Sequence, residues 1–462
     1  MLTCHVVYNL GLPLLGRKAR FDGESWPHYD DPPSRFDLFR SPKRPFRHKI
    51  DSFIHFIRVD TLVRGSHLRD LYIRLPLHRG VPHGIADSLL QIPQGIADSI
   101  LQIIETCRLI ESLDIIVEMY LGSSRHFIEN HPRIPEAISS LKHLKRLSVG
   151  INGSQGCRMM REMQSPLVVA DLQFEFQLSR RVEDYVDTLP LLSPFCSSLK
   201  VLYLEDSEIT AEDIIFPNVE ELCVEGNYPN KIGPLIRSFP NLRRCQLGAM
   251  AKLYRREAPP DMLVAFAKNI VAQENIYWNE LDYLAGYLES ILTYSPRSRV
   301  RHLRVLIPFQ DYSFEVLPAI VHHAQPLCLE LDVRIGSMEA LTQFVEHPNT
   351  VAILSELIPT ETIFFRFVVS GFDLVWLVEG QIVGEDLSPV IASQLLPKPG
   401  SSLQYICVEV KEYPPRLWRI ERPAERDDGL PRAGTRLVEM PHQRAEHIME
   451  EQGFAPQLHR GE

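Results

Sequence analysis

A short phrase of the form L-x-x-L-x-[LIV] recurs along this chain and constrains its fold more than any other feature of the sequence. Each copy follows a helix-like stretch, and a break made by Pro-Asn or Ser-Ser often stands between the two. The phrase itself places apolar residues on one face of a short strand, with polar residues between them. One supersecondary unit that cannot bury its apolar face alone must stack on its neighbours. The pattern therefore favours a solenoid of strand-helix units.

The spacing between copies of the L-x-x-L-x-[LIV] phrase indicates the type of repeat. The middle apolar residues are 20 positions apart between Leu202 and Leu222, 23 between Leu222 and Cys245, and 28 between Leu303 and Leu331. These intervals are typical of leucine-rich repeats. We predict an α/β fold: an irregular leucine-rich-repeat horseshoe with a concave parallel β-sheet and helices on its convex side. The clear copies are SHLRDLYI, KHLKRLSV, SSLKVLYL, PNVEELCV and PNLRRCQL, and the weaker ones are RLIESLDI, RVRHLRV, PLCLELDV and SSLQYICV.

Two stretches interrupt the regular spacing. The 58 positions between Cys245 and Leu303 contain either degenerate repeats or longer helices that interrupt the array, and residues 262–294 look helical enough to fill the interval. GIADSLLQIPQ at 84–94 is followed at once by the near copy GIADSILQI at 95–103. Pro93 interrupts the helical hydrogen bonding between them. We expect the second copy to form the helix of its repeat, running into Cys107.

The run FDLFRSPKRPFRHKIDSFIHFIRVDTLVRGSHLRDLYI, followed by a helix and CRLIESLDIIV, resembles the segment that follows the F-box in fungal F-box/leucine-rich-repeat proteins. The resemblance covers roughly residues 45 to 420. It implies a repeat array that recruits substrates for an SCF-type ubiquitin ligase. Upstream of residue 45 the chain shows no Leu-Pro-x-Glu-like F-box start. An SCF adaptor and cullin are therefore expected as partners only if a cryptic F-box exists.

The composition divides the chain into three parts. Residues 22–45 are rich in Pro and aromatic residues, so we expect residues 1–45 to be an irregular, partly disordered lead-in. Residues 46–420 form the expected solenoid. Residues 421–462 turn to charge, Pro and Gly, which predicts a flexible tail with one marginal helix near 443–451.

Charge and cysteine usage limit the class of partner and the compartment. The net charge of −10 is unfavourable for a general nucleic-acid binder, although SPRSRVRHLR at 295–304 is locally basic. The eight cysteines are scattered without a C-x-x-C pair, which is typical of a reduced intracellular protein. The N-terminal apolar stretch precedes its basic residues, the reverse of a signal peptide. We expect a cytoplasmic or nuclear protein without membrane contact, and a nucleic-acid-associated protein or an enzyme with an unrecognised site is the disfavoured third interpretation.

Enzymatic patterns are weak in this sequence. GINGSQG at 150–156 has a glycine rhythm that could cradle phosphate, but it lacks the Lys-Ser/Thr of a P-loop, and an ordinary loop is the favoured interpretation. His322 and His323 are adjacent, and no other ligand stands at a suitable spacing. Cysteines in the strands are interpreted as core residues. We predict no catalytic residues, no metal and no cofactor.

The x positions of the repeat should project from the concave sheet and make an extended binding surface. Alternating charges with tyrosine anchors suit protein recognition. We predict a non-enzymatic protein-interaction solenoid, related to the substrate-recognition subunits of ubiquitin ligases, or alternatively a scaffold without a ligase link. The candidate partner-binding residues are Tyr72, Arg74, Arg146, Tyr203, Glu205, Glu221, Glu225, Arg244 and Arg304.

Overall fold

The computed structural model divides the chain into two compact units, Met1–Tyr228 and Pro229–Glu462. Both units are α/β, and their strands form open, mostly parallel sheet. The structure describes residues 17–22, 46–59, 64–75, 94–117, 127–151, 153–174, 187–207, 209–226, 231–248, 260–294, 296–308, 317–334, 358, 361–370, 388–395, 401–410, 415–422 and 435–452.

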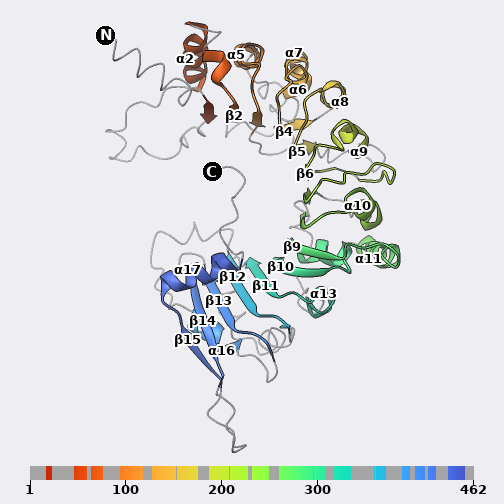
Figure 1. The fold of residues 1–462 in the computed structure, drawn as a ribbon, viewed down its shortest axis with the longest axis vertical. Helices are drawn as coiled ribbons and strands as arrows, with labels where there is room; N and C mark the ends of the chain where they lie inside the picture. The colour runs from red at the N-terminus through yellow and green to blue at the C-terminus, as the bar shows by residue number, and fades with distance from the viewer. Residues whose placement is uncertain are drawn as a thin grey trace, which may run out of the picture. The chain divides into compact units, whose positions relative to one another are not determined.

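The strands of the first unit lie side by side in chain order, and every described pair is parallel (Figure 1). A helix or a longer connection carries the chain back between successive parallel strands, as this geometry requires. The strands are β1 (Lys18–Asp22), β2 (Asp70–Leu75), β3 (Ser112–Val117), β4 (Arg146–Ile151), β5 (Val169–Phe174), β6 (Val201–Glu205) and β7 (Glu221–Glu225).

Helices cover one face of this sheet, because alternate strand residues are apolar. In β2, Leu71, Ile73 and Leu75 are buried, whereas Tyr72 and Arg74 between them remain partly exposed. Each fully buried Leu or Ile contributes about 2 kcal/mol to folding. The helical segments are α2 (Phe46–Val59), η2 (Gly65–His67), α5 (Gln94–Thr106), α6 (Phe127–Asn130), α7 (Arg133–Ser139), α8 (Gly153–Glu162), α9 (Leu189–Leu192) and η5 (Ser193–Phe195).

The predicted repeat phrases are confirmed as strands in both units. All nine fall on strands, and their apolar residues are buried. The second copy of the duplicated segment forms α5 as predicted, ending just before Cys107. The first copy lies outside the described residues.

The second unit continues with parallel strands but ends differently from the prediction. β13 to β15 pair antiparallel, so the expectation of a wholly parallel sheet is wrong at this end. The strands are β8 (Arg244–Gly248), β9 (Glu280–Tyr287), β10 (Arg299–Pro308), β11 (Cys328–Arg334), β12 (Phe364–Ser370), β13 (Tyr405–Val410), β14 (Arg416–Glu421) and β15 (Arg436–Glu439).

The interval 262–294 is not a continuous helix, and it contains a degenerate repeat strand, the other alternative that the spacing left open. It contains most of α11, then β9, then α12, with Leu281 and Leu284 buried as in a repeat strand. Gly286 stands where the third apolar residue belongs. A Cβ on Gly286 would lie 2.2 Å from the carbonyl oxygen of Leu247 on β8. The close approach of the two strands thus requires glycine at this position. Because glycine replaces the third apolar residue, the repeat phrase is not recognisable in the sequence.

Helices also pack on the sheet of the second unit. The pairing of β11 with β10 corrects the predicted start of the repeat phrase on β11. Leu329 lies opposite Leu303 and Leu331 opposite Val305, so the phrase begins two residues earlier than predicted. Cys328 consequently belongs to the other face. The helices are α10 (Ile232–Ser238), α11 (Pro260–Ala272), α12 (Leu288–Tyr294), α13 (Leu317–Ala324), α16 (Ser388–Gln394) and α17 (His442–Glu451).

Both terminal segments contain more regular structure than their composition suggested. Within the predicted lead-in, β1 pairs in parallel with β2 and extends the sheet. Within the predicted tail, β15 pairs with β14, and α17 matches the helix expected near 443–451. This helix packs on the sheet through Ala445 and Ile448, which are 1% and 9% exposed, so it is part of the folded unit.

Candidate interaction surface

We call the side of each sheet opposite its covering repeat helices the open face. In the first unit, parallel register aligns the open-face side chains in three rows that cross the strands. The first row is Lys18, Asp70, Ser112, Arg146, Val169, Val201 and Glu221. The second is Arg20, Tyr72, Asp114, Ser148, Asp171, Tyr203 and Cys223. The third includes Arg74, Ile116, Gly150, Gln173, Glu205 and Glu225.

Seven predicted site residues lie in these rows, and the structure brings one pair of them into contact. The Tyr203 hydroxyl donates a hydrogen bond to Glu221 Oε1 at 2.6 Å, across β6 and β7. The guanidinium of Arg20 lies 4.6 Å from the ring centroid of Tyr72. Such contacts orient the two tyrosine rings on the surface. The seven residues are Tyr72, Arg74, Arg146, Tyr203, Glu205, Glu221 and Glu225.

A pair of carboxylates in the middle row was missed by the sequence analysis. Asp171 on β5 accepts a hydrogen bond from Ser148 Oγ at 3.3 Å, and Asp114 lies on the other side of Ser148. Burial raises the pKa of Asp114, while Ser148 and the charge of Arg146 partly oppose that effect. The sequence does contain a pattern that could have identified Asp114: it is a single acid between two apolar residues of a predicted strand, Leu113-Asp114-Ile115.

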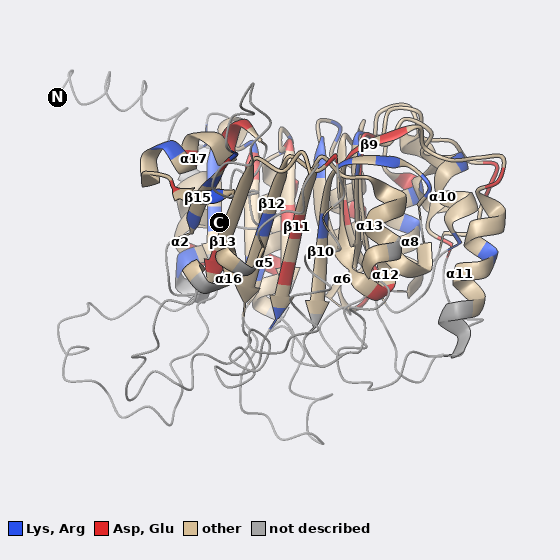
Figure 2. Cartoon of the chain, turned by 90° about the horizontal axis from the view of Figure 1, so that it is seen from below, with Lys and Arg blue, Asp and Glu red and all other residues tan. Residues whose placement is uncertain are grey.

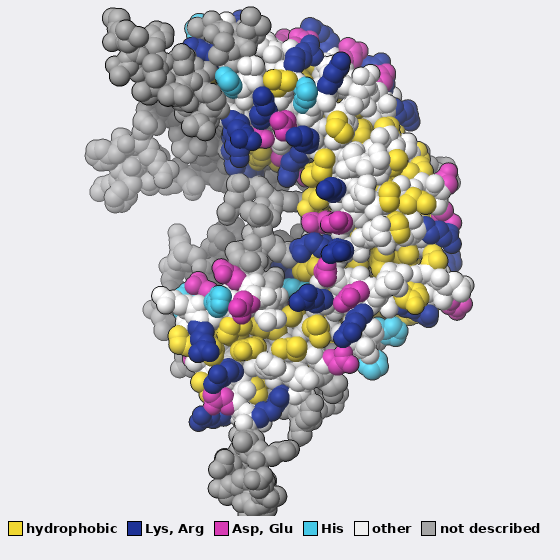
Figure 3. Space-filling view, in the orientation of Figure 1, with side chains coloured by type: hydrophobic (Ala, Val, Ile, Leu, Met, Phe, Trp, Pro, Cys, Tyr) yellow, Lys and Arg dark blue, Asp and Glu magenta, His cyan; other side chains and the backbone are white. Residues whose placement is uncertain are grey.

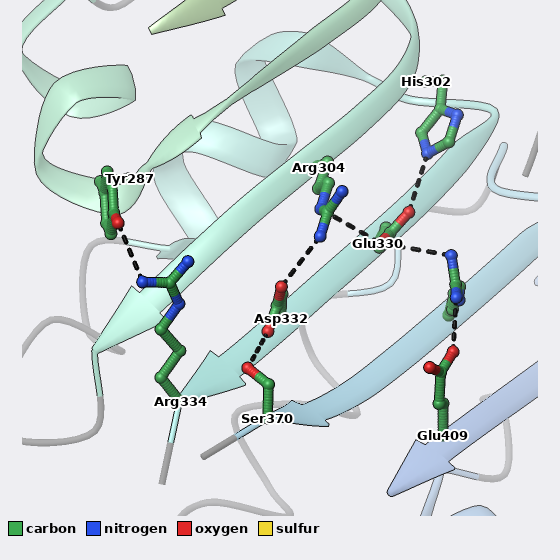
Figure 4. A network of polar contacts seen from close by, with 9 residues as sticks. Tyr287, His302, Arg304, Glu330, Asp332, Arg334, Ser370 and Glu409 are labelled. Carbon is green, nitrogen blue, oxygen red and sulfur yellow. Dashed lines mark hydrogen bonds and ion pairs between the residues drawn. The ribbon is translucent and has the colours of Figure 1, made fainter. Parts of the chain in front are cut away.

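The open face of the second unit holds a network of buried charges at its centre (Figure 4). Glu330 on β11 is contacted by three strand neighbours: His302 Nε2 lies 3.4 Å from Oε2, Arg304 Nε lies 3.2 Å from Oε1, and Arg366 Nη1 lies 3.4 Å from Oε1. Arg304 also donates to Asp332 Oδ2 at 3.0 Å. Figure 2 shows the result as blue, red and blue segments on adjacent β10, β11 and β12.

The network continues onto the neighbouring strands through further hydrogen bonds. Arg366 also donates to Glu409 on β13. Ser370 donates to Asp332 at 2.6 Å, and Arg334 donates to the hydroxyl of Tyr287 at 3.0 Å. Burial acts to raise the pKa of Glu330, but the hydrogen bond from His302 and the charges of Arg366 and Arg304 outweigh it and lower the pKa. The predicted site residue Arg304 is thus held inside the network.

The predicted residue Arg244 has a different environment. Its guanidinium lies 4.9 Å from the ring centroid of Tyr283 on β9. The ring of Tyr283 in turn meets His302 edge-on, with centroids 5.1 Å apart. Arg244 therefore lies beside the buried network, at the β8 side of this sheet.

Helix α17 covers a further part of this open face. Ala445 and Ile448 pack with Cys328, Phe364, Cys407 and Leu417, all of which are buried. Cys407 and Phe364 face away from the repeat helices, as the register with Arg366 and Cys328 shows. An apolar patch at the end of the sheet is thus sealed by the chain itself.

The glycine-rich segment at 150–156 is not the ordinary loop that was predicted, because it contains the end of β4 and the start of α8, and it does not offer a phosphate cradle. Glu129 Oε1 accepts hydrogen bonds from the N–H groups of Gln155 and Gly156 at 2.7 and 3.0 Å, at the start of α8. A Cβ on Gly153, whose φ is +66°, would lie 2.7 Å from the Glu129 carboxyl carbon. An internal carboxylate therefore occupies the position that an anion would take.

Five of the seven cysteines that the structure describes are buried. Burial raises the pKa of Cys107, Cys245 and Cys407 to about 12, so these thiols are protonated at neutral pH. His322 and His323 are exposed in the last turn of α13. No group of three metal-binding side chains occurs within the described part of the chain.

No protein-family model matches the chain, and no curated protein matches it significantly. Among the helices that the structure describes, none has the length and apolar character needed to cross a membrane.

Proposed function

We propose that this chain is a leucine-rich-repeat type of interaction protein that holds a partner protein on the open face of its first unit. The observation that carries the proposal is the register of β1 to β7. It aligns polar and aromatic side chains in three rows on one face, while the repeat leucines are buried under helices on the other. Extended surfaces of this kind are how repeat arrays engage partners.

The exposure of charged side chains differs between the two open faces, and this difference favours the first unit as the one that binds the partner. In the second unit, Glu330 and Asp332 are 3% and 5% exposed and already paired, and α17 covers the adjoining apolar residues. In the first unit, Lys18 and Arg146 are exposed on the open face. Their charged groups reach solvent, where a partner can contact them.

The proposal also concerns the kind of complex that this chain joins. The resemblance to F-box/leucine-rich-repeat proteins favours a role in substrate recruitment for ubiquitination. The alternative is a recognition scaffold that has no ligase link. Both roles use the same surface, and they differ in whether a cullin and its adaptor accompany the partner.

Affinity purification of the tagged full chain from its native cells, followed by mass spectrometry, tests both steps. The blocking variant is Gly150→Trp, because a Cβ at Gly150 would meet no atom closer than the Gln173 carbonyl oxygen at 3.9 Å. The matched control is Arg161→Trp, which places the same side chain on the exposed surface of α8. We expect a reproducible partner with wild type and the control, and its loss with Gly150→Trp.

The composition of the complex decides the rest. A cullin and adaptor recovered with all three chains would establish the ligase role. Their reproducible absence, with the partner retained, would leave the scaffold. A partner retained equally by Gly150→Trp would contradict the proposed surface.

A further inference from the structure

On the open face of the first unit, the charge of the side chains changes sign from one end of the row of strands to the other. The described side chains on β5 to β7 include four acids and no Lys or Arg. Those on β1 to β4 include four cations against Asp70 and Asp114, and Figure 3 shows Lys and Arg gathered beside β2 and β4 in the upper part of the view. The cations are Lys18, Arg20, Arg74 and Arg146, and the acids are Asp171, Glu205, Glu221 and Glu225.

Small side chains occupy part of the middle of the same face. β4 presents Ser148 and Gly150 between the two charged regions, with Asp114 of β3 beside Ser148. The empty space above Gly150 leaves the strand backbone open to close approach. A partner can therefore lie flat across the centre while its ends meet the charged regions.

The size of the face fixes the length of chain it can hold. Neighbouring strands are about 4.8 Å apart, so the six steps from β1 to β7 cover about 29 Å. An extended segment rising about 3.3 Å per residue would cross them with about nine residues. Tyr72 and Tyr203 lie in one row, four strands apart, and provide an aromatic contact toward each end.

We infer that the partner presents an extended segment of about nine residues with an acidic half, which lies over β1 to β4, and a Lys/Arg-rich half, which lies over β5 to β7. This inference rests on the proposed function and specifies the chemistry of the partner. A uniform polyanion such as a nucleic acid fits the basic side of the face but is repelled by Glu205, Glu221 and Glu225, the partly exposed acids of β6 and β7.

The test measures binding of fluorescent peptides to the purified full chain by polarisation. The probe is a block peptide of about nine residues with Glu in one half and Lys in the other, and the comparison peptide has the same composition in alternating order. We expect the block peptide to bind at least about fivefold more tightly, and the preference to vanish near 0.5 M salt because exposed charges are then screened.

Variants assign the preference to the proposed surface. Glu205→Lys with Glu225→Lys should abolish it, and Gly150→Trp should weaken block-peptide binding. Asp213→Lys with Glu162→Lys, on the exposed loop between β6 and β7 and at the exposed end of α8, makes the same charge change off the face and should leave binding unchanged.

Two results would overturn the inference. One is equal or absent binding of the block and alternating peptides, and the other is tighter binding of a single-stranded oligonucleotide than of the block peptide. Neither result touches the proposed function, which is judged separately by the loss of the native partner with Gly150→Trp.

Discussion

Arg304 and Glu330 lie on neighbouring strands with Arg304 Nε 3.2 Å from Glu330 Oε1, and the Glu330 carboxylate is almost completely buried. Arg366 and His302 approach the same carboxylate from both sides. Removing one partner of a buried ion pair leaves an uncompensated charge. The second unit therefore depends on this one side chain more than on any surface pair.

Glu330→Gln should lower the free energy of unfolding at neutral pH by about 3 kcal/mol, measured by urea denaturation. Because the folded-state pKa of Glu330 lies below its ordinary value of 4.5, its contribution is complete above that pH and is lost as the pH falls through the folded-state value. The difference between variant and wild type should therefore shrink in acid. The matched control, Glu361→Gln, breaks an exposed pair with Arg299 and should cost less than about 1 kcal/mol. Equal costs for both variants would show that the network is not stabilising.

The contribution of Asp114 to the free energy of unfolding should depend on pH in the opposite sense to that of Glu330. Its raised folded-state pKa means that ionisation above the ordinary value of 3.8 weakens folding, and this penalty is absent below that pH. Asp114→Asn is thus expected to be more stable than wild type at pH 7, with an advantage that disappears as the pH falls below 3.8. The control Asp213→Asn should stay within about 0.5 kcal/mol of wild type at pH 7. A variant less stable than wild type at pH 7 would contradict the argument from burial.

Two glycines in the sheets make a matched pair. Gly286→Ala places a methyl group 2.2 Å from the Leu247 carbonyl oxygen, so β8 and β9 must separate, at a cost of about 3 kcal/mol. Gly150→Ala meets nothing closer than 3.9 Å and should be neutral or stabilise by about 0.5 kcal/mol, because alanine restricts the unfolded chain. Thermal unfolding of both variants checks the contrast, and similar losses at the two sites would argue against it.

Glu129 should be a structural anchor for α8. Glu129→Ala leaves the N–H groups of Gln155 and Gly156 without their acceptor and should destabilise the first unit by about 1–2 kcal/mol. The exposed acid Glu162, at the other end of the same helix, serves as control, and Glu162→Ala should cost less than about 0.5 kcal/mol. Loss of partner binding without loss of stability in Glu129→Ala would instead indicate a functional role for this loop.

The strands were predictable where the repeat phrase keeps its apolar residues, as in Leu199, Leu202 and Leu204. Six described strands carry no predicted phrase, and in two of them small residues replace large ones: Ala170 occupies the middle position in β5, and Gly286 the last position in β9. The close approach of β8 requires the glycine at 286, and the sequence of a single strand does not specify that approach. The hydrophobic pattern thus predicts the array but not its irregular members.

The surface was predictable in position but not in pairing. Alternation places Tyr203, Glu205 and Arg304 on the open face without further information. Whether Arg304 meets Glu330 depends on register across a connection of irregular length, which spacing alone cannot give. For the same reason the covering of the second open face by α17 could not be foreseen, since a helix of ten residues with two buried side chains resembles an exposed one in sequence.

Site-specific photo-crosslinking most directly tests the claim that the first open face holds the partner. A photoreactive phenylalanine analogue at position 150 faces the centre of this surface, and the same analogue at position 161 lies on exposed α8. Both chains are irradiated in native cells and the crosslinked products identified by mass spectrometry. A single partner protein crosslinked from position 150 but not from 161 is the predicted result. Crosslinking of that partner from 161 and not from 150 would contradict the account.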